Sequence, residues 1–140
     1  MESVENIVEK LNNKKLGNKF EKDFMDLLAK KGYWVTFLEG KANIGSQPCD
    51  IIAIRRDNIE LYDCKTLANK NGLFPISRIE ENQRLAFERL RKCRNPLTVF
   101  ALSILWNNNI YIVDFDDINF YEKSIDLKKI GPILEGFYEN

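Results

Sequence analysis

Three charged residues in two neighbouring apolar segments have the types and the spacing to act on a phosphodiester. Asp50 opens the apolar run 50–54, and Asp63 and Lys65 lie at the end of the run 59–65. Residues two apart in a β-strand share one face at a spacing of ~6.6 Å, so Asp63 and Lys65 should project together. Isolated charges are costly to bury among apolar side chains. The charged cluster is therefore expected to bind an ion or a substrate, or to form ion pairs within itself. A divalent metal ion together with a phosphodiester would neutralise the charges of all three residues.

The chemistry that fits these residue types is metal-assisted hydrolysis. Mg²⁺ positions a water and neutralises transition-state charge when one or two carboxylates anchor it and it keeps several waters. Asp50 and Asp63 are the expected anchors, and Lys65 is expected to position or deprotonate the water. Glu21 is a candidate third carboxylate, because it follows Phe20 on a helix face expected to turn toward the core.

The elements that must position these residues follow from hydrophobic periodicity. Apolar residues at helical spacing predict helices over 14–31, with a weaker stretch at 4–11, and over 79–93. Ser77 is the expected N-cap of the second helix, with Glu80 completing a capping box. Runs rich in β-branched and aromatic residues predict strands at 33–38, 50–54, 59–65, 97–106 and 110–115. Residues 55–58 and 107–109 are expected turns, 40–48 and 66–77 loops, and 125–136 a short helical segment.

The predicted order of elements is αβββαββ plus a C-terminal helix. That order is typical of an α/β architecture with a mixed central β-sheet flanked by helices. At 140 residues, 44% of them hydrophobic, the chain is expected to form one domain, residues 1–140, with its own core. No apolar run approaches the ~20 residues needed to span a bilayer, and the acidic start does not resemble a signal peptide, so a cytoplasmic location is expected.

The absence of histidine excludes several classes of catalyst. Without histidine the chain cannot build Ser-His-Asp or Cys-His nucleophiles, histidine-ligated zinc, or the chemistry of HNH nucleases. The three cysteines have no CxxC spacing, which favours free thiols over a zinc site or disulfides. The 21 basic residues equal the 21 acidic ones, unlike the profile of a strongly basic nucleic-acid binder, so the placement of charge matters more than its sum.

The ordered set of residues resembles the PD-(D/E)XK nuclease superfamily, and within it the RecU-like Holliday junction resolvases. The features that carry the resemblance lie in residues 14–115: the segment Gly17-Asn18-Lys19-Phe20-Glu21, Asp50, Asp63-Cys64-Lys65, Leu73-Phe74-Pro75-Ile76, and Glu81-Asn82-Gln83. The resemblance implies a restriction-endonuclease-like core and a Mg²⁺- or Mn²⁺-dependent endodeoxyribonuclease that acts on four-way DNA junctions in recombination and repair. It implies that Glu21, Asp50 and Asp63 hold the metal ion, that Lys65 acts on the attacking water, and that Gln83 supports the site from its rim.

Contacts to DNA and a second subunit are expected around that site. A four-way junction has near two-fold symmetry, so a homodimer could place two sites on opposed strands. Basic and polar residues near the helix of Glu21, in the two loops and on the second helix are candidates for binding the DNA backbone. They are Lys14, Lys15, Lys19, Lys41, Ser46, Lys70 and Arg84.

Less specific interpretations of the same residues stay open. Asp63 and Lys65 could form a structural pair at a strand end, and Glu21 taken singly is an ordinary surface helix residue. Two other functions share the fold: a restriction-like or repair endonuclease acting on duplex or flap DNA, and a non-catalytic module that binds DNA or a protein partner. Cleavage of junction, duplex and flap DNA with Mg²⁺ separates these three.

Overall fold

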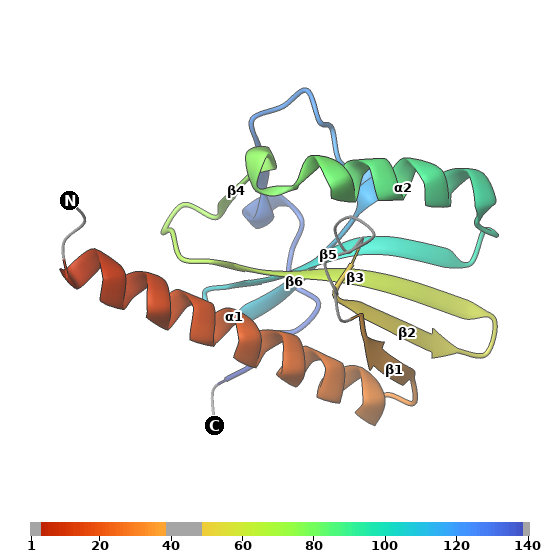
Figure 1. Ribbon diagram of the computed structural model, residues 1–140, viewed down its shortest axis with the longest axis horizontal. Coiled ribbons are helices and arrows are strands. Elements are labelled where there is room, and N and C mark those ends of the chain that lie inside the picture. Colours follow the sequence, from red (N-terminus) through yellow and green to blue (C-terminus); the bar gives the residue numbers. More distant parts are fainter. Residues whose placement is uncertain (1–3, 39–48, 139–140) are drawn as a thin grey trace.

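The computed structural model describes residues 4–38 and 49–138, with the side chains of 5–14 outside that description. A mixed sheet lies between two long helices, one on each face (Figure 1). The elements in chain order are α1 (Val4–Lys30), β1 (Trp34–Phe37), β2 (Ile51–Arg55), β3 (Asn58–Leu67), β4 (Leu73–Pro75), the 3-10 turn η1 (Ile76–Arg78), α2 (Glu81–Cys93), β5 (Thr98–Trp106), β6 (Asn109–Asp114), η2 (Phe115–Asp117), β7 (Ser124–Asp126) and η3 (Leu127–Lys129).

The main sheet has the strand order β1-β2-β3-β5-β6. Only β3 and β5 run parallel, paired from Ile59 with Thr98 to Leu67 with Trp106, and the other neighbours are antiparallel. A parallel pair needs a crossover connection, which η1 and α2 supply. The expected mixed sheet with helices on both faces is confirmed. The predicted loop 40–48, which holds Lys41 and Ser46, lies outside the described residues. The description resumes at Cys49.

Helix α1 covers one face of the sheet as a single helix, where the sequence indicated a weaker stretch before residue 14. Phe20, Phe24 and Leu28 recur every four residues, so they share one face of the helix, and they pack on Ala53 and Tyr62 of the sheet. The ring centroids of Phe24 and Tyr62 lie 5.1 Å apart in an edge-to-face arrangement. This packing fixes the rotation of α1, and with it the direction of Glu21.

Helix α2 covers the opposite face, on which Phe87 packs against Phe100 and Phe115 with centroid distances of 5.9 Å and 5.2 Å. The helix begins later than predicted, because Glu80 and not Ser77 is its N-cap. Gln83 lies three residues after Glu80, so the two side chains can each accept from the other's backbone N–H and complete the capping box. Ser77 lies instead in η1, where it is exposed.

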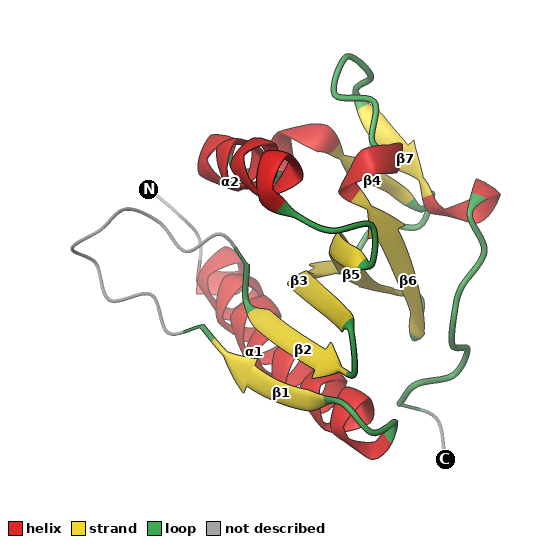
Figure 2. Cartoon of the chain, turned by 90° about the vertical axis from the view of Figure 1, so that its right-hand side faces the viewer, coloured by secondary structure: helices red, strands yellow, loops and turns green. Residues whose placement is uncertain are grey.

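Two regions predicted as irregular or helical contain short strands. β4 pairs with β7 in an antiparallel ribbon, with Phe74 opposite Ile125, and Figure 2 shows this ribbon beside the main sheet. The expected C-terminal helix is replaced by β7, the single 3-10 turn η3 and an extended tail. Because side chains alternate between the two faces of a strand, pairing with β4 places Ile125 against the core. A helix over the same residues would lose this packing.

The turn between β5 and β6 holds the tail against α1. Asn107 and Asn108 have positive φ angles of 50° and 64°, a conformation that asparagine tolerates. Asn108 accepts hydrogen bonds from Phe137 through its carbonyl (2.7 Å) and from Tyr138 through its side chain (2.9 Å). Tyr138 in turn donates its hydroxyl to Asp23 on α1 at 2.8 Å. The tail therefore closes one side of the core formed with α1.

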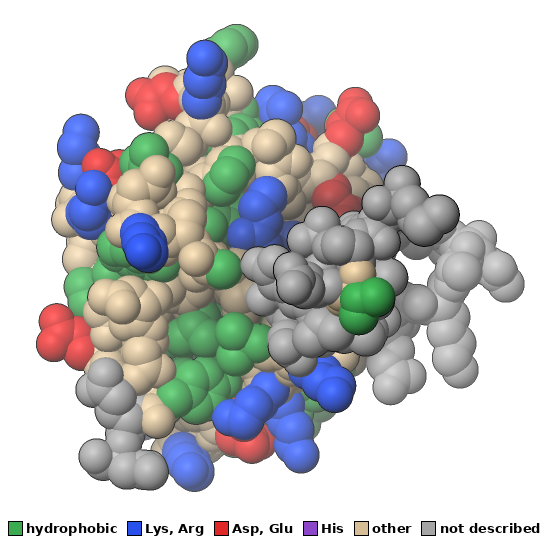
Figure 3. All heavy atoms as spheres, turned by 90° about the vertical axis from the view of Figure 1, so that its left-hand side faces the viewer, with side chains coloured by type: hydrophobic (Ala, Val, Ile, Leu, Met, Phe, Trp, Pro, Cys, Tyr) green, Lys and Arg blue, Asp and Glu red, His purple; other side chains and the backbone are tan. Residues whose placement is uncertain are grey.

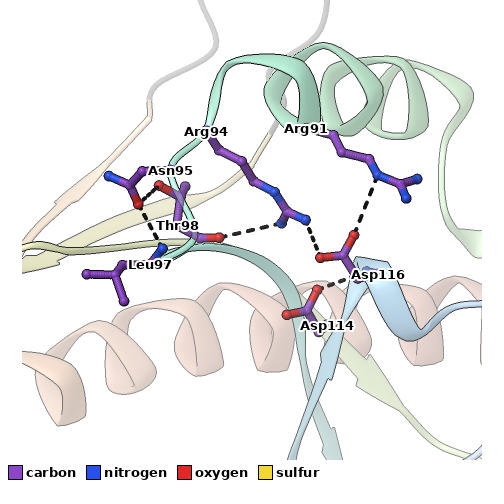
Figure 4. Close-up of polar contacts among 7 residues, drawn as sticks. All are labelled: Arg91, Arg94, Asn95, Leu97, Thr98, Asp114 and Asp116. Carbon is purple, nitrogen blue, oxygen red and sulfur yellow. Dashed lines mark hydrogen bonds and ion pairs between the residues drawn. The ribbon is translucent and has the colours of Figure 1, made fainter.

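Basic residues at the end of α2 are tied to the acidic segment after β6 (Figure 4). Arg94 forms an ion pair with Asp116 and donates to the carbonyl of Thr98 at 3.5 Å. Arg91 lies 3.9 Å from the same carboxylate. These contacts anchor the return from α2 into β5. No helix among the described residues is long and apolar enough to cross a bilayer.

Candidate active site

Asp50 immediately precedes β2, where its carboxylate takes the place of a strand hydrogen bond. The backbone N–H of Asp50 donates to the carbonyl of Tyr62 at 2.8 Å, which continues the β2–β3 ladder by one residue. Beyond that point the Asp50 Oδ2 atom accepts from the backbone N–H of Cys64, also at 2.8 Å. The carboxylate is thereby fixed beside the strand segment that carries Asp63 and Lys65.

Asp63 and Lys65 lie on one face of β3, as predicted, and they contact each other. The Lys65 Nζ and Asp63 Oδ2 atoms are 3.1 Å apart. The Asp63 side chain is almost completely buried and Lys65 is mostly buried, at 3% and 16% side-chain exposure. Oδ2 is close enough for an ion pair, yet it has no well-directed hydrogen bond from any described residue. Its acceptor capacity is therefore only partly used.

Burial and neighbouring carboxylates raise the pKa values of two acidic residues in this part of the sheet. Burial raises the pKa of Asp63 to about 7; a hydrogen bond with the Asp50 carboxyl acts in the same direction, and Lys65 opposes it. Burial, followed by the charge of Asp50, raises the pKa of Glu21 to about 7, again against Lys65. Glu21 on α1 is thus within electrostatic reach of Asp50 and Lys65. Like charges held together in a buried site give such shifts.

A divalent cation fits the chemistry of this donor set. Among the described residues no three His, Cys, Asp or Glu side chains stand close enough to form a ready metal cluster. Mg²⁺ needs only one or two carboxylates from a protein. Asp50 and Asp63 form such a pair, with an acceptor atom of Asp63 left without a directed hydrogen bond. A cation here would also offset the mutual repulsion that Glu21 shares.

Gln83 is buried, with an exposed fraction of 5%, in the first turn of α2. Its Oε1 atom accepts from the backbone N–H of Glu80 at 3.2 Å, so the structure gives it a helix-capping role. Its expected supporting contact at the rim of the site stays a prediction. The neighbouring Asn82 has a buried Nδ2 atom without a hydrogen-bond partner among the described residues.

The basic residues predicted to bind DNA are dispersed. Lys15 is exposed on α1 and Lys70 is exposed in the loop after β3. Lys19 lies 3.0 Å from Asp23 and 3.9 Å from the centroid of the Tyr138 ring. Arg84 stacks on Phe120 at 4.3 Å, on the outer side of α2. The side chain of Lys14 and all of Lys41 and Ser46 lie outside the described residues.

One cation beside the site was not among the predicted residues. Arg78 of η1 donates through Nη1 to the carbonyl of Thr66, the residue after Lys65, at 2.7 Å. Arg78 was hard to predict because it lies just after the Phe74-Pro75-Ile76 segment but belongs to no motif or periodic pattern. The β3–β4 connection brings it back to the end of β3.

The same fold is found in Hjc, a Holliday junction resolvase from the archaeal hyperthermophile Archaeoglobus fulgidus. The two structures match with a TM-score of 0.55 and 20% sequence identity, over 85% of this chain and 94% of that chain. No protein-family model and no curated protein matches the sequence. The predicted restriction-endonuclease-like fold is therefore confirmed. The likeness concerns the fold alone and does not distinguish the RecU-like group.

Proposed function

We propose that this protein is a metal-dependent endodeoxyribonuclease that resolves four-way DNA junctions, with a site similar to that of the RecU-like resolvases. The observation that carries the proposal is the convergence of Asp50, Asp63 and Lys65 between β2 and β3. They meet on a fold shared with a Holliday junction resolvase. A merely structural ion pair would not account for two further carboxylates held beside it with one lysine to balance them.

In this proposal each residue has one task. Asp50 and Asp63, with Glu21 beside them, hold Mg²⁺ or Mn²⁺, which when bound supplies charge neutralisation and an acidic water. Lys65 orients the attacking water and offsets charge on the scissile phosphate. The hydrogen bond from the Cys64 backbone N–H keeps the Asp50 carboxylate in place beside Asp63.

Cleavage of both opposed strands of a junction requires two such sites. We propose a homodimer, because a two-fold axis in the protein would match the near two-fold axis of the junction. A dimer would also double the basic surface available to DNA, which a chain with no net charge needs.

The deciding experiment compares four-way junction, linear duplex and flap DNA of the same sequences, each with Mg²⁺ and with EDTA. Preferential Mg²⁺-dependent cutting of the junction, lost in Asp50→Asn and Lys65→Met, supports the proposal. Cutting of duplex or flap alone would assign a restriction-like or repair endonuclease. If the folded protein cuts none of them with Mg²⁺ or Mn²⁺, the nuclease function is wrong.

A further inference from the structure

A groove of about 400 Å³ begins where β3 leaves the candidate active site. It lies between α1, the end of β3, the β5–β6 turn and the tail, and its lining includes Leu16, Thr66, Arg78, Asn108 and Tyr138. Figure 3 looks onto this end of the molecule, where a hydrophobic surface is bordered by lysine and arginine side chains. Thr66 follows Lys65 directly, so the lining of the groove begins one strand residue, ~3.4 Å, along β3 from the site, with the Thr66 side chain on the opposite face of the sheet from Lys65.

Arg78 is held at the wall of this groove from two sides. Its Nη1 atom donates to the carbonyl of Thr66 at 2.7 Å, and its guanidinium group stacks on Phe74 at 5.0 Å from the ring centroid. Phe74 is fully buried in the core, so it forms a rigid support. A guanidinium group has five N–H donors, and the contact with Thr66 uses one nitrogen of three. The remaining donors stay available to the groove.

The charge of Arg78 is not neutralised by an ion pair with any carboxylate in the described part of the chain. Among the described residues no Asp or Glu lies within ion-pairing distance of it, whereas Arg91 and Arg94 both pair with Asp116. The carboxylate that it does sense is Asp63: burial lowers the pKa of Arg78, and Asp63 acts in the opposite direction. A fixed, unpaired guanidinium next to a groove fits the planar, bidentate recognition of a phosphate.

We propose that Arg78 binds a backbone phosphate of the DNA strand next to the scissile phosphate, and that the strand leaves the active site along this groove. The inference rests on the proposed nuclease function. It gives the Phe74-Pro75 segment a defined task, since Phe74 positions the arginine from the core.

Arg55 is a matched control at the opposite end of β3. It also donates through Nη1 to a backbone carbonyl, that of Lys31 at 3.1 Å, and it stacks on Tyr33 at 4.5 Å. It belongs to the β2–β3 hairpin and does not line the groove. Arg55→Gln therefore removes the same charge and the same kinds of contact away from the proposed DNA path.

The experiment measures junction affinity in EDTA by fluorescence anisotropy over a series of salt concentrations, with thermal unfolding as a check of folding. We expect Arg78→Gln to weaken binding about tenfold and to reduce the slope of log affinity against log salt by about 1. Arg78→Lys should keep most of the slope and lose part of the affinity, and Arg55→Gln should change neither. With Mg²⁺, the loss in Arg78→Gln should appear mainly in KM.

Two results would overturn the inference. One is a folded Arg78→Gln protein with the affinity and salt slope of the wild type; the other is an equal loss in Arg55→Gln, which would indicate diffuse charge. If Arg78→Gln does not fold, Arg78→Lys decides, because unchanged affinity and KM there would exclude bidentate phosphate binding. Failure of the wild-type protein to cut any DNA would instead contradict the proposed function itself.

Discussion

The Asp50 carboxylate accepts a hydrogen bond of 2.8 Å from the backbone N–H of Cys64, the residue between Asp63 and Lys65. One side chain thus has two roles, since it extends the β2–β3 pairing and lies beside the buried Asp63 carboxyl. The two roles can be separated by substitution, because an amide oxygen can still accept the hydrogen bond and an alanine cannot.

Asp50→Asn should keep the fold and lose the activity. We expect its free energy of unfolding to stay within about 1 kcal/mol of the wild type or to increase, while Mg²⁺-dependent cleavage is abolished. Asp50→Ala should lose about 1–3 kcal/mol as well as activity, because the N–H of Cys64 is then left without its partner. Urea unfolding and a junction-cleavage assay measure the two effects. Equal stability of the two variants would show that the hydrogen bond contributes nothing.

The metal-free protein should lose stability as the pH rises from 3.8 to about 7, where Asp63 is protonated in the folded chain and ionised in the unfolded one. A carboxyl group with a raised folded-state pKa makes the folded state bind more protons across that window, so the free energy of unfolding falls with pH. The loss should be on the order of a few kcal/mol. Thermal unfolding in EDTA at pH 5 and pH 8 measures it.

Asp63→Asn is the control for that pH effect. It should be more stable than the wild type at pH 8 in EDTA and should lose the share of the pH 5 to pH 8 difference that Asp63 contributes, while the share of Glu21, whose pKa is also raised to about 7, remains. Added Mg²⁺ should stabilise the wild type at pH 8, since a ligand that binds only the folded state raises its stability by mass action, and should do so far less in the variant. A wild-type profile that is flat between pH 5 and pH 8 would contradict the raised pKa.

Replacement of Lys65 should affect the rate more than the binding of DNA. Lys65→Met removes the group proposed to act on the water, and we expect the single-turnover cleavage rate to fall by about 10²–10⁴. Junction affinity in EDTA should change little, because Lys65 is mostly buried against Asp63. Rapid-quench cleavage and anisotropy separate the two quantities. A variant that cuts normally would exclude Lys65 from catalysis.

Two glycines should respond oppositely to alanine. Gly72 has a φ of +71°, and a Cβ there would lie 2.7 Å from the Trp106 ring, so Gly72→Ala should cost about 2 kcal/mol or more. A Cβ at Gly17 on α1 would meet nothing within 4 Å, so Gly17→Ala should stabilise the protein by about 0.5–1 kcal/mol. Urea unfolding of both proteins tests the pair. If Gly17→Ala is more stable but binds the junction more weakly, DNA approaches the helix closely at that point.

The strands of the main sheet and both long helices were predictable because their signals are local. The spacing of Phe20, Phe24 and Leu28 marks one helix face, and the apolar run 59–65 marks a strand. The start of α2 was harder to predict, because Ser77 is a preferred N-cap residue and Glu80 is not, whereas in the structure Glu80 caps the helix and Ile79 and Gln83 are buried. β4 and β7 are three residues each and pair across about fifty residues of sequence, a contact that no local pattern reports.

The candidate site was predictable in its residue types and not in its contacts. Asp63 and Lys65 share a face by strand geometry, but the hydrogen bond that places Asp50 depends on where the β2–β3 ladder stops. Arg78 was missed because its relation to Thr66 comes from the path of the β3–β4 connection. Lys19 was predicted to bind DNA from its place beside Glu21, whereas the structure engages it with Asp23 and the tail.

The hydrogen bond between Tyr138 and Asp23 joins residues 115 positions apart in the chain. Asp23 lies two residues after Glu21, on the helix whose rotation sets the direction of that carboxylate. Substitutions around Tyr138 are therefore expected to act on the helix that carries the proposed metal ligand Glu21. A bulky group attached next to Tyr138 would disturb that contact, so a cleavage assay on such a protein would measure the added group together with the proposed activity.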